Sequence, residues 1–494
     1  MGAATPTLLL ASLREAVLTL AAALVAMAGA LALDPEPGPA VLAVVLALSL
    51  SRSGLDRSLR GRVEAAVVLP VVGLGALGIG LLLKSEPWLG ALAFTSAIAG
   101  GIWLRRFGPA GTQAGTLIAL PCIVLLVVPR VHAEQAGPVL RLALPVLVAL
   151  LALLSVSLFH ALGQRIGWVE APPLEPRRAR ATLTPVTADT AAAAAPNPAA
   201  PPRRLAVSTR QALQMAVALG AAFALGYLVF PGHWAWLVLT AYIVGSANRG
   251  RLDVVHKSVQ RVLGAAAGTL VALGVGHAFG PGGPGGALGP AGTSALILLA
   301  LFLGVWLRPL GYGWWALFVT VALALLQGLG GTEPLLGQRL GEIVVGALIG
   351  VAAACWVLPL RSSDVLRKRI GDALAALSEA LASPEPAAAP RAAAFEAGLA
   401  GVARVGAPFR AVRWVPRRWW RPHPVDWVDE LMACRAPALA LIERGGAAPG
   451  AVRKSVGAAR LALREPAQIQ PALAALRTAL AAGQGAPRAA PSGD

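Results

Sequence analysis

The chain has little charge. Asp, Glu, Lys and Arg account for only 13% of its 494 residues, whereas hydrophobic residues account for 56%, and the mean hydropathy is +0.68. A soluble domain carries about 25% charged residues. This deficit excludes an ordinary soluble globular protein and indicates an integral membrane protein.

Residue types that carry much of enzyme chemistry are also scarce. No lysine follows a glycine, so the chain lacks the phosphate loop of an ATPase. The histidines are scattered without metal-ligand spacing, and no nucleophile elbow or carboxylate pair is present. We therefore expect no enzyme activity, no metal and no cofactor. The cysteines lie far apart in sequence and are interpreted as structural thiols: Cys122, Cys355 and Cys434.

What the chain does have is a series of apolar runs, several near the roughly 20 residues that cross a bilayer. A Pro/Ala-rich stretch, 170–204, interrupts the series and is predicted to be a disordered linker. After Pro359 the sequence becomes polar, with Ala/Leu-rich stretches typical of helices. Twelve spans are predicted: 10–33, 37–51, 63–83, 87–104, 112–129, 138–160, 210–230, 232–247, 258–279, 292–307, 312–330 and 337–359.

Several phrases occur twice, at nearly constant spacing. "GIWLRRFG" at Gly101 returns as "GVWLRPLG" at Gly304, and "SLREA" at Ser12 returns as "STRQA" at Ser208. Because each copy holds six spans, the copies point the same way through the membrane. The predicted fold is an all-α polytopic membrane protein with two tandem six-helix repeats, 1–165 and 207–360, a linker at 166–206, and a helical cytoplasmic C-terminal region at 361–494.

The net charge of +18 would suggest nucleic acid binding in a soluble domain. Here the basic residues instead cluster at the ends of apolar runs, where they set membrane orientation. The loops on one side hold Lys84, Arg130, Arg141 and Arg339. The opposite loops hold Arg52, Arg57, Arg60, Arg62, Arg105, Arg106, Arg249, Arg251, Lys257, Arg261 and Arg308. We expect both termini in the cytoplasm and no nucleic acid partner.

The second copy carries three phrases: "HWAWLVLTAYIVGSANRGRLD" from His233, "GYGWWALFVTVALAL" from Gly311, and "QRLGEIVVGALIG" from Gln338. These features resemble the FUSC family of fusaric acid resistance and aromatic acid exporter-like inner-membrane proteins. The resemblance covers about 205–360 well and 10–160 weakly. It implies a multi-pass protein of the bacterial inner membrane that exports aromatic carboxylates. The more distant aluminium-activated malate channels of plants imply that paired six-span units line an anion route.

Two short apolar segments, 37–51 and 231–248, occupy matching positions in the repeats, and such segments often mark a transport site. The alternative is that they are ordinary short helices accommodated by the bilayer. Arginines at the span ends anchor helices, or turn inward and bind carboxylates. The candidate substrate-binding residues are Arg249, Arg261, Arg308, Trp234, Trp236 and Tyr312.

Arg339 and Glu342 lie three residues apart at the start of the last span. Opposite charges at this spacing favour a structural ion pair, and Glu342 is also the best carboxylate for proton coupling. Gly264 with Gly268, and Gly346 with Gly350, have the spacing of close helix packing.

A stretch of the C-terminal region interleaves arginines with tryptophans, including Trp427, and predicts an interfacial contact with anionic lipid. The predicted function is export of small organic, aromatic anions. A channel-like passive anion path and a non-transporting membrane scaffold remain alternatives. The expected partners are membrane lipid and the anion, and a periplasmic adaptor and a homo-oligomer are left open.

Overall fold

The computed structural model describes residues 4–52, 59–127, 138–168, 205–246, 248–279, 289–329, 336–382, 388–413, 423–444 and 449–485. The chain divides into two compact units. The membrane unit comprises Met1–Ala247 and Lys257–Leu358, and the second unit comprises Asn248–His256 and Pro359–Asp494. The predicted linker 170–204 and the Trp/Arg-rich residues 414–422 lie outside the described residues.

Every described element is a helix. In the part of the chain described for the first predicted repeat these are α1 (Ala4–Leu33), α2 (Pro37–Arg52), α3 (Leu59–Ser85), α4 (Pro87–Leu104), the 3₁₀ turn η1 (Arg105–Phe107), α5 (Pro109–Val127) and α6 (Pro138–Arg165). The second predicted repeat holds α8 (Val207–Val229), α9 (Trp234–Gly245), α10 (Arg251–Phe279), α11 (Pro290–Trp306), the 3₁₀ turn η3 (Arg308–Leu310), α12 (Tyr312–Leu329) and α13 (Leu336–Trp356).

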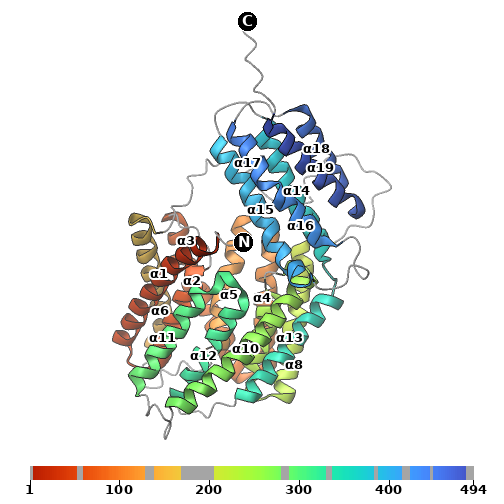
Figure 1. The fold of residues 1–494 in the computed structure, drawn as a ribbon. Coiled ribbons are helices and arrows are strands. Elements are labelled where there is room, and N and C mark those ends of the chain that lie inside the picture. The colour runs from red at the N-terminus through yellow and green to blue at the C-terminus, as the bar shows by residue number, and fades with distance from the viewer. Residues whose placement is uncertain are drawn as a thin grey trace. The chain divides into compact units, whose positions relative to one another are not determined.

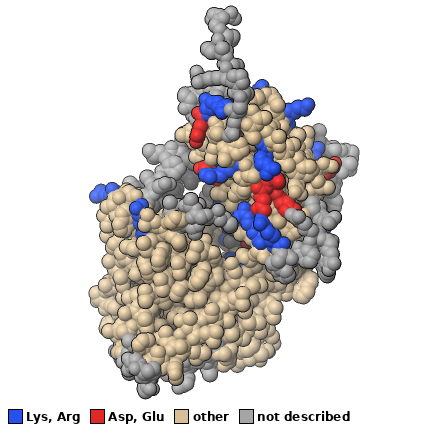
Figure 2. All heavy atoms as spheres, in the orientation of Figure 1, with Lys and Arg blue, Asp and Glu red and all other residues tan. Residues whose placement is uncertain are grey.

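The surface of the membrane unit is apolar. Among the described residues, six helices are long and apolar enough to cross a membrane, and six shorter apolar helices accompany them. Leu154, Leu228 and Leu263 are each more than 60% exposed. Figure 2 shows few charged side chains over the face formed by α10, α11 and α12. Such a surface is stable against lipid hydrocarbon rather than water, which makes the chain a membrane protein.

Helices α2 and α9 are much shorter than a bilayer requires. With 16 residues in α2 and 12 in α9, these helices extend about 24 Å and about 18 Å, against about 30 Å of hydrocarbon. Helix α9 begins two residues later than the predicted 232–247 span. The turn before it ends at His233, whose backbone N–H donates to the Phe230 carbonyl. A short helix leaves polar side chains at its ends within reach of the membrane interior.

Helices at matching positions in the two halves pack against helices that also match. Helix α1 packs against α2 and α6, and α8 packs against α9 and α13. Helix α4 packs against α5, and α11 packs against α12, as Figure 1 also shows for the latter pair. Between the two halves, α4 contacts α8 and α11 contacts α1. The 3₁₀ turns follow the same order, since η1 contacts α8 and η3 contacts α1.

Glycines bring two helix pairs into close approach, as their spacing predicts. A Cβ atom at Gly346 would lie 2.6 Å from the Leu237 carbonyl oxygen on α9. A Cβ atom at Gly264 would lie 2.5 Å from the Gly313 carbonyl oxygen on α12. Only glycine permits these backbones to approach so closely. Helix α13 is thereby fixed against α9, and α10 against α12.

The second unit is a helical bundle of α14 (Ser362–Ala382), α15 (Ala388–Ala411), α16 (Pro424–Ala433), α17 (Arg435–Arg444), α18 (Gly450–Ala462) and α19 (Pro466–Gly485). Its core contains Leu366, Phe395 and Trp427. Since Trp427 is 2% exposed, the predicted interfacial role is wrong for this residue. Burial raises the pKa of the Cys434 thiol to about 12, and the nearby Glu430 adds to the rise, so this cysteine is a protonated packing group.

Candidate functional site

The polar centre of the membrane unit lies at the start of α13. Arg339, Glu342, Gly346 and Gly350 follow one another at three- and four-residue steps, so they share one face of the helix. Gly346 and Gly350 touch α9. The same face therefore presents Arg339 and Glu342 to the beginning of α9, and both side chains are buried, at 5% and 1% exposure.

The guanidinium of Arg339 is held on two sides. Its Cζ lies 3.9 Å from the centre of the Trp236 ring, which is a cation–π contact. Its Nη1 donates to Oε1 of Gln327 on α12 over 3.4 Å. The Nε and Nη2 atoms are buried and have no hydrogen-bond partner. These two atoms form the edge with which arginine binds a carboxylate in a bidentate manner.

Glu342 contacts the turn that precedes α9. Its Oε1 lies 3.9 Å from Nδ1 of His233, and the same nitrogen lies 3.4 Å from Nε2 of Gln338. His233 is 43% exposed, whereas neither oxygen of Glu342 has a hydrogen-bond partner. The buried carboxylate is therefore linked to an exposed imidazole.

The ion pair predicted from the spacing of Arg339 and Glu342 is not formed. No salt bridge joins them among the described residues, because Arg339 is directed to Trp236 and Gln327, and Glu342 to His233. The two groups still interact electrostatically without contact. Contacts with neighbouring helices direct the two side chains away from each other, and each side chain keeps polar atoms that have no hydrogen-bond partner.

Arg261 is a second buried cation. Helix α10 begins at Arg251, seven residues before the predicted span, so Arg261 lies about 15 Å along the helix rather than at its mouth. It is 2% exposed, its Nε has no hydrogen-bond partner, and it interacts electrostatically with Arg339. Arg249 and Arg308 are both exposed, and Arg249 belongs to the second unit. The three arginines therefore do not share one environment.

The predicted aromatic residues do not form one cluster. Trp234 packs against Phe223 and Tyr227 of α8, with ring centres 5.5 Å and 5.4 Å away. Tyr312 lies 6.0 Å from Nζ of Lys257, which donates to the Ser246 carbonyl at the far end of α9. Of the three, Trp236 alone contacts a charged group of the polar centre.

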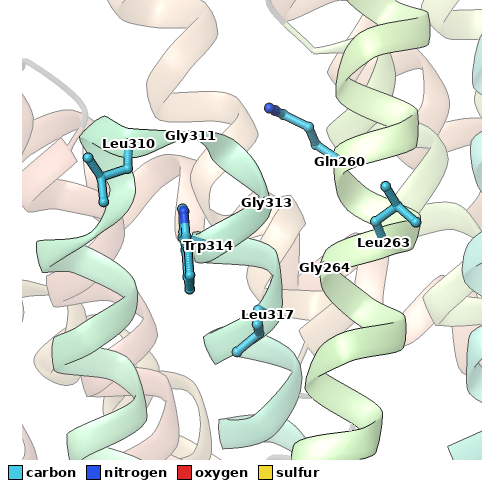
Figure 3. Close-up of a pocket in the computed structure, with 8 residues that line it drawn as sticks. All are labelled: Gln260, Leu263, Gly264, Leu310, Gly311, Gly313, Trp314 and Leu317. Carbon is cyan, nitrogen blue, oxygen red and sulfur yellow. The ribbon is translucent and has the colours of Figure 1, made fainter. Parts of the chain in front are cut away.

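A crevice with a volume of about 310 Å³ lies between α10 and the beginning of α12. Figure 3 shows Gln260 extending from α10 toward the turn at Gly311, with the Trp314 indole on the opposite wall. The walls are mainly apolar, and Gln260 directly precedes the buried Arg261. The lining residues are Gln260, Leu263, Gly264, Leu310, Gly311, Gly313, Trp314 and Leu317.

Sequence reasoning missed His233 and Gln327. His233 had no ligand spacing, and Gln327 lay within an apolar run. The signal that could have found Gln327 is the cost of an amide in a lipid-facing helix, which requires a polar partner. Within the described residues, no group of three or more His, Cys, Asp or Glu side chains could hold a metal ion.

The polar centre lies within the part of the chain that matches a family model. The family model described as fusaric acid resistance protein-like matches residues 216–353, a range that includes His233, Trp236, Arg261, Gln327, Arg339 and Glu342. Comparisons with curated proteins and with solved structures each find no match. Residues 216–353 are therefore similar to the FUSC family, as the sequence motifs predict.

Proposed function

We propose that the protein is a multi-pass transporter of the bacterial inner membrane that exports small organic anions. FUSC proteins are transporters rather than enzymes, and the apolar helices support a membrane transport role. The observation that carries the proposal is the buried Arg339, whose Nε and Nη2 edge lacks a partner. That edge has the geometry and charge for one carboxylate.

Electrostatics favours an anion at this position. Arg339 and Arg261 contribute two positive charges and Glu342 one negative charge, which leaves a net charge of about +1 in the buried cluster. A buried arginine costs about 2.5–3.5 kcal/mol on insertion scales when it is not compensated. A monovalent anion neutralises the excess. A membrane potential of about 100 mV, negative inside, would add about 2.3 kcal/mol in favour of its exit.

The crevice supports an aromatic substrate. The Trp314 indole and Leu317 offer an apolar surface for a ring, and Gln260 offers an amide beside it. Arg261 follows Gln260 directly in α10. We propose that the ring of an aromatic carboxylate occupies this crevice on its path, and that the carboxylate passes to the two buried arginines.

The proposed architecture is two parallel six-helix repeats. In two such repeats, α4 corresponds to α11 and α8 corresponds to α1. The contact of α4 with α8 then corresponds to the contact of α11 with α1, and the presence of both contacts supports this architecture. The loop charges support a cytoplasmic position for both termini and for the second unit. The protein would contact membrane lipid and either a periplasmic adaptor or a second copy of itself.

Two alternatives make different predictions. A channel-like path would conduct anions without coupling, and a scaffold would bind envelope partners through its second unit without transport. The deciding experiment measures the flux of an aromatic and aliphatic anion panel from proteoliposomes, with and without an imposed proton gradient. Flux that the gradient alters supports the transporter, gradient-independent flux supports the channel, and no flux for any anion supports the scaffold.

A further inference from the structure

We infer that the cluster of Glu342, His233 and Arg339 binds a proton and an organic anion together, so that protonation strengthens anion binding. The inference rests on the proposed anion site at Arg339. It adds a second ligand, the proton, with Glu342 and His233 as its binding groups.

The geometry provides a route for the proton. His233 is 43% exposed at the beginning of α9, and its Nδ1 lies 3.9 Å from Oε1 of the buried Glu342. In the neutral imidazole, Nε2 of Gln338 can donate to the same nitrogen over 3.4 Å, and a proton on that nitrogen would break this contact. A water-exposed imidazole therefore lies beside a carboxylate that is otherwise only 1% exposed.

The charges around Glu342 come from a small set of groups. Arg339 precedes it by one turn on α13 and interacts with it electrostatically. Helix α10 contributes Arg261, which interacts with Arg339. The turn before α9 contributes His233, and α12 contributes the neutral amide of Gln327, which binds Arg339.

Several other titratable groups on α8, α9, α10 and α12 are directed elsewhere. On α8, Arg210 donates to the Leu358 carbonyl and Tyr227 donates to the Pro87 carbonyl. On α9, Tyr242 interacts electrostatically with Arg105 and Cys122. On α10 and α12, Lys257 and Tyr312 contact each other near the far end of α9. These groups leave His233 and Glu342 as the proton acceptors of the cluster.

The sign of the linkage follows from the net charge. With Glu342 ionised and His233 neutral, the two arginines give the cluster a charge of about +1. A proton on Glu342 or on His233 raises the charge to about +2, and the attraction for an anion increases. Protonation of Glu342 also removes a negative charge that repels the anion. Because linkage is reciprocal, a bound anion strengthens proton binding by the same factor.

The experiment measures binding of two probes, benzoate and benzenesulfonate, to the full chain in lipid nanodiscs. Isothermal titration calorimetry is performed from about pH 5 to about pH 8, the interval in which histidine changes its charge. Benzenesulfonate keeps its charge throughout, so its pH dependence belongs to the protein. We expect its dissociation constant to increase by roughly 5- to 150-fold as the pH rises, which is the usual range of coupling between two ligands.

Two variants assign the effect. Glu342→Gln should bind the anion at high pH as tightly as the wild type binds it at low pH, with a smaller pH dependence. His233→Gln should keep the part of the pH dependence that comes from Glu342. The matched controls, Glu15→Gln and His277→Gln, change exposed residues of α1 and α10 and should follow the wild type.

The outcomes separate the two proposals. Wild-type binding that does not change with pH, or an unchanged pH dependence in Glu342→Gln, overturns the linkage and leaves the anion site intact. Absence of binding of both probes at every pH contradicts the proposed function, and the linkage fails with it.

Discussion

Replacement of Arg339 by lysine tests the anion site without removing its positive charge. Lysine keeps one cation on α13 but has no planar group to lie over Trp236 at 3.9 Å. It also has no Nε and Nη2 edge, the part of Arg339 that is buried without a partner. If the site binds a carboxylate through that edge, Arg339→Lys should weaken binding although the net charge is unchanged.

The magnitude follows from the contacts that are lost. The bidentate geometry provides two charge-assisted hydrogen bonds, and the ammonium of lysine can replace one of them. Loss of the other costs about 1.5–3 kcal/mol, which corresponds to a roughly tenfold to hundredfold loss of affinity. The 3.4 Å bond to Gln327 is long and contributes little to this difference.

The assay is the concentration dependence of benzoate efflux from proteoliposomes, at matched amounts of reconstituted protein. Arg308→Lys serves as the control, because Arg308 is exposed in η3 and lies outside the polar centre. Wild-type half-saturation in Arg339→Lys would refute the bidentate site. An equal loss of affinity in Arg339→Lys and Arg308→Lys would indicate a general effect of lysine and would also refute the bidentate site.

Other predictions address the neighbouring parts of the membrane unit. Arg261→Lys should weaken benzoate transport by roughly tenfold or more, measured as half-saturation. Arg308→Lys should behave as the wild type. Equal behaviour of the two variants would indicate that Arg261 only anchors its helix. Trp314→Ala should reduce the preference for benzoate over acetate in a competition assay, and an unchanged preference would remove the crevice from the path. Gly346→Leu should lower the melting temperature and abundance, because its Cβ would lie 2.6 Å from the Leu237 carbonyl oxygen. Gly341→Leu, where the Cβ meets open space, should lower neither. An equal loss in both variants would contradict close packing of α13 against α9 at Gly346.

The class of the fold could be predicted because each membrane helix is determined by its own segment of the sequence. Each span satisfies its own backbone hydrogen bonds, so an apolar run of sufficient length predicts a helix without knowledge of its neighbours. Close packing at Gly264 and Gly346 was also predictable, since small residues four apart mark helix contacts. The start of α10 was missed because Arg251 and Asp253 interrupt the apolar pattern, although they continue the same helix.

The candidate site was predictable only in its residue types. Arg261, Arg339, Glu342 and Trp236 could be singled out, because charged and aromatic residues are costly or oriented in a membrane. Which of them meet depends on how α9, α10, α12 and α13 pack, and no single-sequence pattern reports that. The spacing of Arg339 and Glu342 favoured an ion pair, but contacts from other helices override that local preference.

The most direct test of the anion site at Arg339 is the position of a bound substrate analogue. A cryo-electron microscopy structure of the full chain with 4-iodobenzoate would place the heavy iodine atom and the carboxylate independently. We predict the carboxylate on the Nε and Nη2 edge of Arg339, beside the Trp236 ring. Density for the analogue at another place in the membrane unit, with that edge still unoccupied at saturating concentration, would contradict it.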